Sequence, residues 1–119
     1  MRSVSVTVEQ LRPFVGDPRI VVRRLTIDRN VPLYPVSAGH LDTRPKKSVP
    51  AGVYEIHGYG EWLLVEADSV RRINEAEALI ALGAVRALKD LGLDDAAISL
   101  ATGDLTNARY QWLRHRDGK

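Results

Sequence analysis

The sequence predicts an α+β fold, in which a three- or four-stranded, mostly antiparallel sheet with a central hairpin packs against a long helix and a C-terminal helix. Three segments support this prediction. Residues 52–67 alternate apolar and polar side chains around Gly58-Tyr59-Gly60, which is typical of a β-hairpin. Residues 74–91 are rich in Ala and Leu and are followed by Gly92, a common residue at the end of a helix. Residues 105–116 predict the C-terminal helix.

The size of the chain predicts a single domain. Its 119 residues, of which 45% are hydrophobic, are enough for one hydrophobic core. We expect one domain over residues 1–119, in which residues 1–32 are an N-terminal extension and residues 50–119 form the hairpin–helix core.

The N-terminal extension is expected to hold one short helix and one strand. Residues 7–15 predict the helix, capped by Ser5 or Thr7, and Pro13 is expected to end or bend it. Residues 19–27 are rich in β-branched side chains and predict the strand.

Two segments are less regular. Residues 31–50 contain four prolines, so we expect a long irregular connection with a short strand at 33–37. Residues 93–102 fit either a strand from Ala96 to Leu100 or a helix that begins at Asp94-Asp95.

Composition excludes several kinds of site. The chain has no cysteine, which excludes disulfides and zinc sites built on thiolates. The three histidines, His40, His57 and His115, are scattered, which argues against a metal cage made of imidazoles. No apolar run approaches the length of about 18 residues that spans a bilayer, and the first residues do not resemble a signal peptide. We therefore expect a cytoplasmic protein with no membrane partner.

Local clusters of basic residues, rather than the net charge of +2, predict a nucleic-acid partner. Most of these residues are arginine, whose guanidinium group suits phosphate. Aromatic side chains on a sheet beside basic residues can stack unpaired bases. The alternative is that the clusters are solvated surface and that the aromatic rings pack in the core. The candidate nucleic-acid-binding residues are Arg44, Lys46, Lys47, Tyr59, Trp62, Arg71, Arg72, Arg109 and Arg114.

The C-terminal residues 94–116 also fit a helix-turn-helix motif. In that interpretation Asn107, Gln111 and Arg114 face the major groove of DNA. The alternative is a terminal amphipathic helix whose apolar side docks on the sheet.

Glu77 stands out on the predicted long helix. If residues 74–91 form one continuous helix, Glu77 lies on the apolar side with Ile80, Ala84 and Leu88. A carboxylate facing the core is costly without a partner, so it is a candidate site residue. The alternative is a capping box, in which Glu77 bends back to the backbone N–H of Asn74.

Residues 42–104 resemble a ribonuclease H-like domain. Pro50-Ala51-Gly52, the hairpin, Asn74-Glu75-Ala76-Glu77 and an Ala/Leu-rich helix ending in Leu91-Gly92 follow one another as the corresponding features do in that superfamily. The resemblance implies hydrolysis of phosphodiesters by two metal ions held on carboxylates.

In that resemblance Glu77 matches the carboxylate on the helix, and Asp42 stands for the carboxylate of the first strand, with Asp28 as an alternative. The third carboxylate is expected near Ala101, and the nearest acid is Asp104. The catalytic candidates are thus Glu77, Asp104 and Asp42, and Glu77 and Asp104 are the metal ligands. Because the carboxylate set departs from the pattern, the resemblance implies a degenerate, non-catalytic member.

Three function classes follow from these observations. The first is a non-catalytic nucleic-acid-binding protein that uses the basic clusters and the hairpin aromatics and needs no cofactor. The second is a ribonuclease H-like phosphodiesterase that uses Glu77 and requires Mg²⁺ or Mn²⁺. The third is a small interaction module that forms a homo-oligomer.

Overall fold

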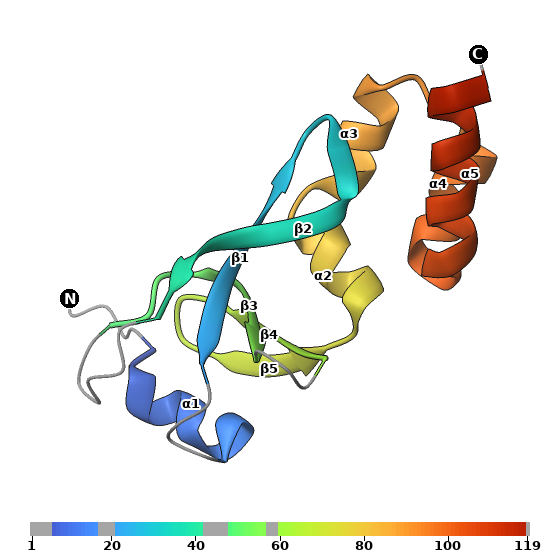
Figure 1. Cartoon of the computed structure of the whole chain (residues 1–119). Coiled ribbons are helices and arrows are strands. Elements are labelled where there is room, and N and C mark those ends of the chain that lie inside the picture. Colours follow the sequence, from blue (N-terminus) through green and yellow to red (C-terminus); the bar gives the residue numbers. More distant parts are fainter. Residues whose placement is uncertain (1–5, 17–20, 42–47, 57–59, 119) are drawn as a thin grey trace. The chain divides into compact units, whose positions relative to one another are not determined.

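The computed structural model describes residues 6–16, 21–41, 48–56 and 60–118, and it confirms the α+β class (Figure 1). The sheet has five strands in the order β2-β1-β3-β4-β5, so the expected three or four strands were too few. The strands are β1 (Val22–Asp28), β2 (Val31–His40), β3 (Gly52–Ile56), β4 (Glu61–Val65) and β5 (Val70–Ile73). The helices are α1 (Val8–Val15), α2 (Glu75–Ala81), α3 (Ala84–Asp90), α4 (Asp95–Gly103) and α5 (Leu105–Gly118).

The chain forms two compact units. The sheet unit comprises Met1–Thr26 and Ser37–Asn74, and the helical unit comprises Ile27–Val36 and Glu75–Lys119. The strands β1 and β2 run through both units, so the tip of their hairpin belongs to the helical unit.

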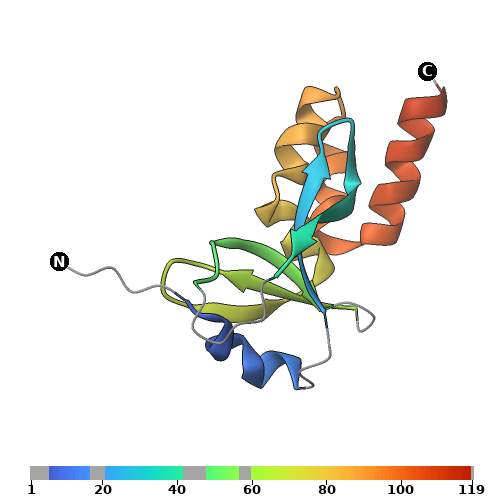
Figure 2. The same ribbon diagram turned by 60° about the vertical axis from the view of Figure 1, so that its left-hand side comes forward.

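The sheet unit contains the predicted hairpin, which β3 and β4 confirm. Their antiparallel register pairs Tyr54 with Leu63 and Gly52 with Val65, and β5 continues the sheet by pairing Val70 with Val65. One face therefore carries Tyr54, Leu63 and Val65, all of which are buried. Figures 1 and 2 show α1 against this face, where Leu11 joins the same core cluster.

The short helix α1 begins where the sequence predicts. The side chain of Gln10 accepts a hydrogen bond from the backbone N–H of Thr7 at 2.8 Å, which is one half of a capping box. Pro13 lies inside the helix and does not end it, contrary to one of the two expectations. The helix stops instead at Gly16, whose φ of 80° lies in the left-handed region.

The strand β2 is longer than the short strand expected at 33–37. It contains Pro32 and Pro35, which lack a backbone N–H. The strand β2 lies at the edge of the sheet, where a residue without a backbone N–H is tolerated better than in a central strand. The strand β5, which contains Arg71 and Arg72, was not expected at all.

The predicted long helix of residues 74–91 is wrong, because the chain breaks it into α2 and α3 at Leu82 and Gly83. Gly83 has a φ of 91°, and its N–H donates to Ile80 O at 3.0 Å, which closes α2 with a tight turn. Its own carbonyl then accepts from Ala87 N at 3.0 Å and starts α3. A left-handed residue changes the direction of the chain, so the two halves do not share one helical wheel.

The helical unit has its own core. Residues 95–103 form α4, which decides the open question between strand and helix. The predicted helix of residues 105–116 is confirmed as α5. The largest buried side chains of this core include Leu33, Leu79, Leu88 and Trp112. Burial of such a side chain stabilises a fold by about 1.5–3 kcal/mol. The helices α2, α3, α4 and α5 thus form a core together with Leu33, whereas α1 covers the sheet face described above.

Among the described residues, none of the helices combines the length and the apolar character required to cross a bilayer.

Candidate nucleic-acid interface

The helix α5 begins with an N-cap formed by Asp104. Asp104 lies between α4 and α5, and its Oδ1 accepts a hydrogen bond from Asn107 N at 3.1 Å. This is the usual geometry of an aspartate at an N-cap, where it satisfies a backbone N–H that has no partner in the helix. Asp104 therefore caps the helix.

The inner side of α5 holds the helix to its unit. Ala108 and Trp112 are each only 2% exposed and lie one turn apart, on the side that packs in the core. The Trp112 ring lies 5.8 Å from the Tyr34 ring. An apolar pair at this spacing fixes which side of the helix faces outward.

The outer side of α5 carries the residues that the helix-turn-helix interpretation singled out. Asn107, Gln111 and Arg114 are all exposed, and their spacing of four and three residues places them in one stripe. Tyr110, which is 58% exposed, lies beside them. We call Asn107, Tyr110, Gln111 and Arg114 the outer stripe of α5.

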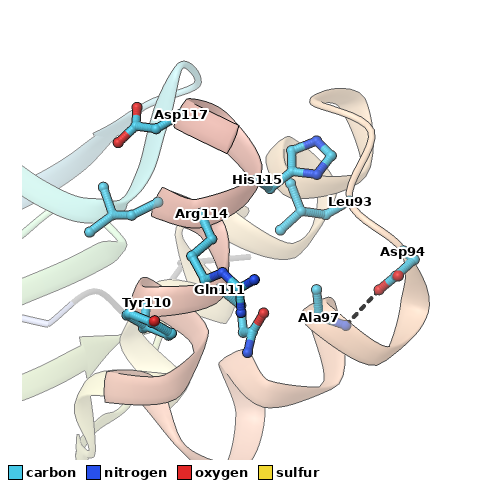
Figure 3. A pocket seen from close by; sticks show the side chains of 9 residues that line it. Leu93, Asp94, Ala97, Tyr110, Gln111, Arg114, His115 and Asp117 are labelled. Carbon is cyan, nitrogen blue, oxygen red and sulfur yellow. Dashed lines mark hydrogen bonds between the residues drawn. The ribbon is translucent and has the colours of Figure 1, made fainter. Parts of the chain in front are cut away.

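The second half of the outer stripe borders an open groove of about 680 Å³. Figure 3 shows Gln111 and Arg114 projecting from α5 on the side of Asp94, which precedes α4, and of Ala97 in its first turn. Asp94 is itself engaged as the cap of α4, because its Oδ1 accepts from Ala97 N at 2.8 Å. At the far end of the groove, Asp117 pairs with Arg116 at 3.1 Å. Both carboxylates that border the groove therefore have partners.

The charge of α5 favours an anionic ligand. The helix contains three arginines and one histidine against a single acid, Asp117, which pairs with Arg116. The guanidinium of Arg114 lies 5.9 Å from the centre of the Tyr110 ring, in a cation–π contact. Within the part of the chain that the structure describes, no ion pair of Arg114 with a carboxylate is found. Its charge is thus available to a ligand.

Arg109, another predicted nucleic-acid-binding residue, makes its contacts within the helical unit. Its Nε donates to Leu33 O at 3.0 Å, and its Nη2 lies 3.0 Å from Glu75 Oε1. The guanidinium also lies 5.1 Å from the centre of the Tyr34 ring. These contacts tie the tip of the β1–β2 hairpin and the start of α2 to α5, so we assign Arg109 a structural role.

The predicted arginines that the structure describes in the sheet unit do not form one basic surface. Arg71 and Arg72 are neighbours on β5 and so point to opposite faces of the sheet. Arg71 lies 3.9 Å from Glu66, and Arg72 lies 3.8 Å from Glu61. Arg72 also donates to Phe14 O at 3.3 Å. These carboxylates offset the positive charge that the sequence pattern suggested.

Trp62 is half-buried on β4, where it pairs with Ile73 and with Glu55 in the register of the sheet. Because side chains alternate between the faces of a strand, Trp62 and Arg71 share one face and Arg72 lies on the other. The predicted residues Arg44, Lys46, Lys47 and Tyr59 lie outside the described residues.

The candidate carboxylates that the structure describes, Glu77, Asp104 and Asp28, form no metal site. Glu77 is exposed, together with Ile80, and Ala78 and Leu79 are the buried residues of α2. The expected inward position of Glu77 was wrong because it was based on one continuous helix over residues 74–91, which the structure does not contain. Asp104 is occupied as the cap of α5, and Asp42 lies outside the described residues. In the described ranges no group of three His, Asp or Glu side chains comes close enough to hold a metal ion.

Asp28, the other candidate for the first carboxylate, ends β1, where its Oδ1 accepts from Asn30 N at 2.8 Å in the turn to β2. Ala101, near which the ribonuclease H-like resemblance implies the third carboxylate, belongs to the helix α4.

The sheet unit has a smaller hollow of about 240 Å³ near Tyr54. The Tyr54 hydroxyl donates to Pro50 O at 2.7 Å, and Arg24 donates to Ala51 O at 3.1 Å. Burial raises the pKa of Tyr54, and the nearby positive charge of Arg24 partly opposes this shift. His40 and Ser48 also line the hollow. The polar groups here hold the chain before β3 against the sheet.

The sequence interpretation left out Tyr110 and gave Asp104 a different role. Tyr110 belongs to the outer stripe by its spacing of three from Asn107, and this spacing was the available signal. Asp104 was assigned to metal binding, although an Asp three residues before Asn107 fits a helix cap.

Comparisons with protein-family models, with curated proteins and with solved structures find no match for this chain.

Proposed function

We propose that the protein binds double-stranded DNA, with the outer stripe of α5 in the major groove. The observation that supports this proposal most strongly is the exposed, unpaired position of Arg114 among the described residues. Arg114 is exposed, it has no carboxylate partner among the described residues, and it shares one helical stripe with Asn107 and Gln111. Arg, Asn and Gln are the side chains that most often recognise base edges in the major groove.

The dimensions of α5 fit this role. The helix has 14 residues, and Asn107 and Arg114 are seven residues apart. At about 1.5 Å per residue the stripe extends about 10 Å, which matches about three base pairs at 3.4 Å each. The opposite side of α5 is anchored by Trp112, so the stripe is held on a rigid element.

A nuclease activity has less support. A two-metal mechanism needs converging oxygen ligands. Of the sequence candidates, Glu77 is exposed on α2 and Asp104 caps α5. We therefore propose a binding protein without catalysis.

The proposal is tested by titrating the protein into a fluorescently labelled DNA duplex of about 20 base pairs and following the anisotropy. Two or three neutralised phosphates predict an affinity about ten- to fortyfold weaker at about 200 mM salt than at about 50 mM. A duplex RNA of the same sequence serves as the control, because its deep, narrow major groove does not admit side chains from a helix. The proposal fails if the two duplexes bind equally, or if DNA binding is absent or indifferent to salt.

A further inference from the structure

We propose that Asp104 fixes the side-chain amide of Asn107 so that Asn107 recognises adenine, an inference that rests on the proposed function. Asp104 makes two contacts with the same residue. Its Oδ1 accepts from Asn107 N at 3.1 Å, and its Oδ2 accepts from Asn107 Nδ2 at 2.7 Å. The first contact is the helix cap, and the second holds the side chain.

The chemistry of the second contact determines the orientation of the amide. An ionised carboxylate only accepts hydrogen bonds, so the NH₂ group of Asn107, and not its oxygen, faces Asp104. One N–H of this group is used by Asp104. The other N–H and the Oδ1 atom remain for a ligand.

The remaining donor and acceptor form the pattern that complements adenine. In the major groove adenine presents the N7 acceptor beside the N6 amino donor, and an Asn amide pairs with both. Guanine presents two acceptors there, N7 and O6, and pairs less well with an amide whose oxygen cannot turn away. Asn107 lies in the first turn of α5 and is exposed, as this contact requires.

Asp104 restricts the side-chain amide of Asn107 to one orientation. Without Oδ2 the amide of Asn107 can rotate, and ordering a free side chain on binding costs affinity for the matched base. Asp104 is thus a positioning residue for Asn107 and has no predicted contact with DNA.

The test selects binding sites from a randomised duplex DNA library and sequences them. The wild-type protein is expected to prefer adenine at one position, and Asn107→Ala is expected to lose that preference alone. Asp104→Ser keeps a good N-cap, because serine caps helices as well as aspartate does. It lacks the second oxygen, so the adenine preference is expected to fall about two- to tenfold. Circular dichroism checks that the helix content of Asp104→Ser is unchanged.

Each result of this selection either supports or overturns the inference about Asp104 and Asn107. The inference is overturned if the wild-type protein selects no adenine, if Asn107→Ala keeps the preference, or if Asp104→Ser equals the wild type. Should Asp104→Ser fail to fold, the comparison of wild type with Asn107→Ala still decides whether Asn107 recognises adenine, and Asp104→Asn, which keeps a cap but turns an NH₂ group toward Asn107, replaces it. Absence of salt-dependent binding in the DNA titration overturns the proposed function, whereas DNA binding without a preference for adenine overturns only this inference.

Discussion

At the scale of single residues, two arginines on one helix have different roles. Arg109 and Arg114 both belong to α5 and both lie in the same run without acidic residues. Arg109 is 28% exposed at its side chain and donates to Leu33 O, while Arg114 is exposed and lies over Tyr110. The two residues are of the same type, and their roles differ because different groups lie within reach of their guanidinium groups.

Replacing Arg109 with alanine is expected to destabilise the helical unit. The change removes a hydrogen bond from a charged group to Leu33 O and an ion pair with Glu75. Loss of such half-buried bonds costs about 1–3 kcal/mol. Chemical denaturation measures the free energy of unfolding. Arg86→Ala is the matched control, because Arg86 is highly exposed and lies 3.7 Å from Asp90 on the surface of α3. Equal stability of the two variants contradicts the structural role of Arg109.

Tyr54 is expected to make stability depend on alkaline pH. Burial raises the pKa of Tyr54 in the folded state above its value in the unfolded chain. Between these two values the folded state binds more protons, so stability falls as the pH rises above about 10. The tyrosinate also loses the bond that the hydroxyl donates to Pro50 O. Unfolding measured at about pH 9 and about pH 11 is expected to show a larger loss in the wild type than in Tyr54→Phe. An identical loss in both proteins removes Tyr54 from the explanation.

At the scale of elements, one glycine accounts for the difference between the single long helix that was predicted and the two helices that are observed. Gly83 separates α2 from α3 with a φ of 91°. The break turns Glu77 outward, although a continuous helix would place it with Leu88 on the core side. Local periodicity cannot reveal such a break, because an isolated glycine inside a helical pattern is tolerated in many helices.

Alanine at Gly83 is expected to lower stability by about 1–2 kcal/mol, because a side chain disfavours the left-handed region. A Cβ added at this position would meet no neighbouring atom within 4 Å, so the cost comes from the backbone conformation alone. Gly103→Ala is the control, since Gly103 ends α4 without a positive φ and also has open space around it. Thermal unfolding is expected to rank Gly83→Ala below the wild type and Gly103→Ala at or above it. The reverse order contradicts the assigned helix break.

At the scale of the whole molecule, local patterns predicted part of the fold. The hairpin of β3 and β4 and the helix α5 were predictable because each depends on neighbouring residues. The strand β5 pairs with the neighbouring β4 across residues 66–69, but it was not predicted because it is only four residues long and two of them are arginine. The division into two units was not predictable, because it depends on packing between distant segments.

The same holds for the candidate interface. The spacing of Asn107, Gln111 and Arg114 was visible in the sequence. The internal role of Arg109 was not, because its acceptor Leu33 lies 76 residues away.

The most direct test of the proposed interface compares two single variants in the same DNA titration. Arg114→Ala removes the exposed cation of the outer stripe, and Arg86→Ala removes an equal charge from α3 of the same unit. If the outer stripe contacts DNA, Arg114→Ala is expected to weaken binding by at least about fivefold, and Arg86→Ala by less than about twofold. Equal affinities of the two variants would contradict the assignment of α5 as the DNA-binding element.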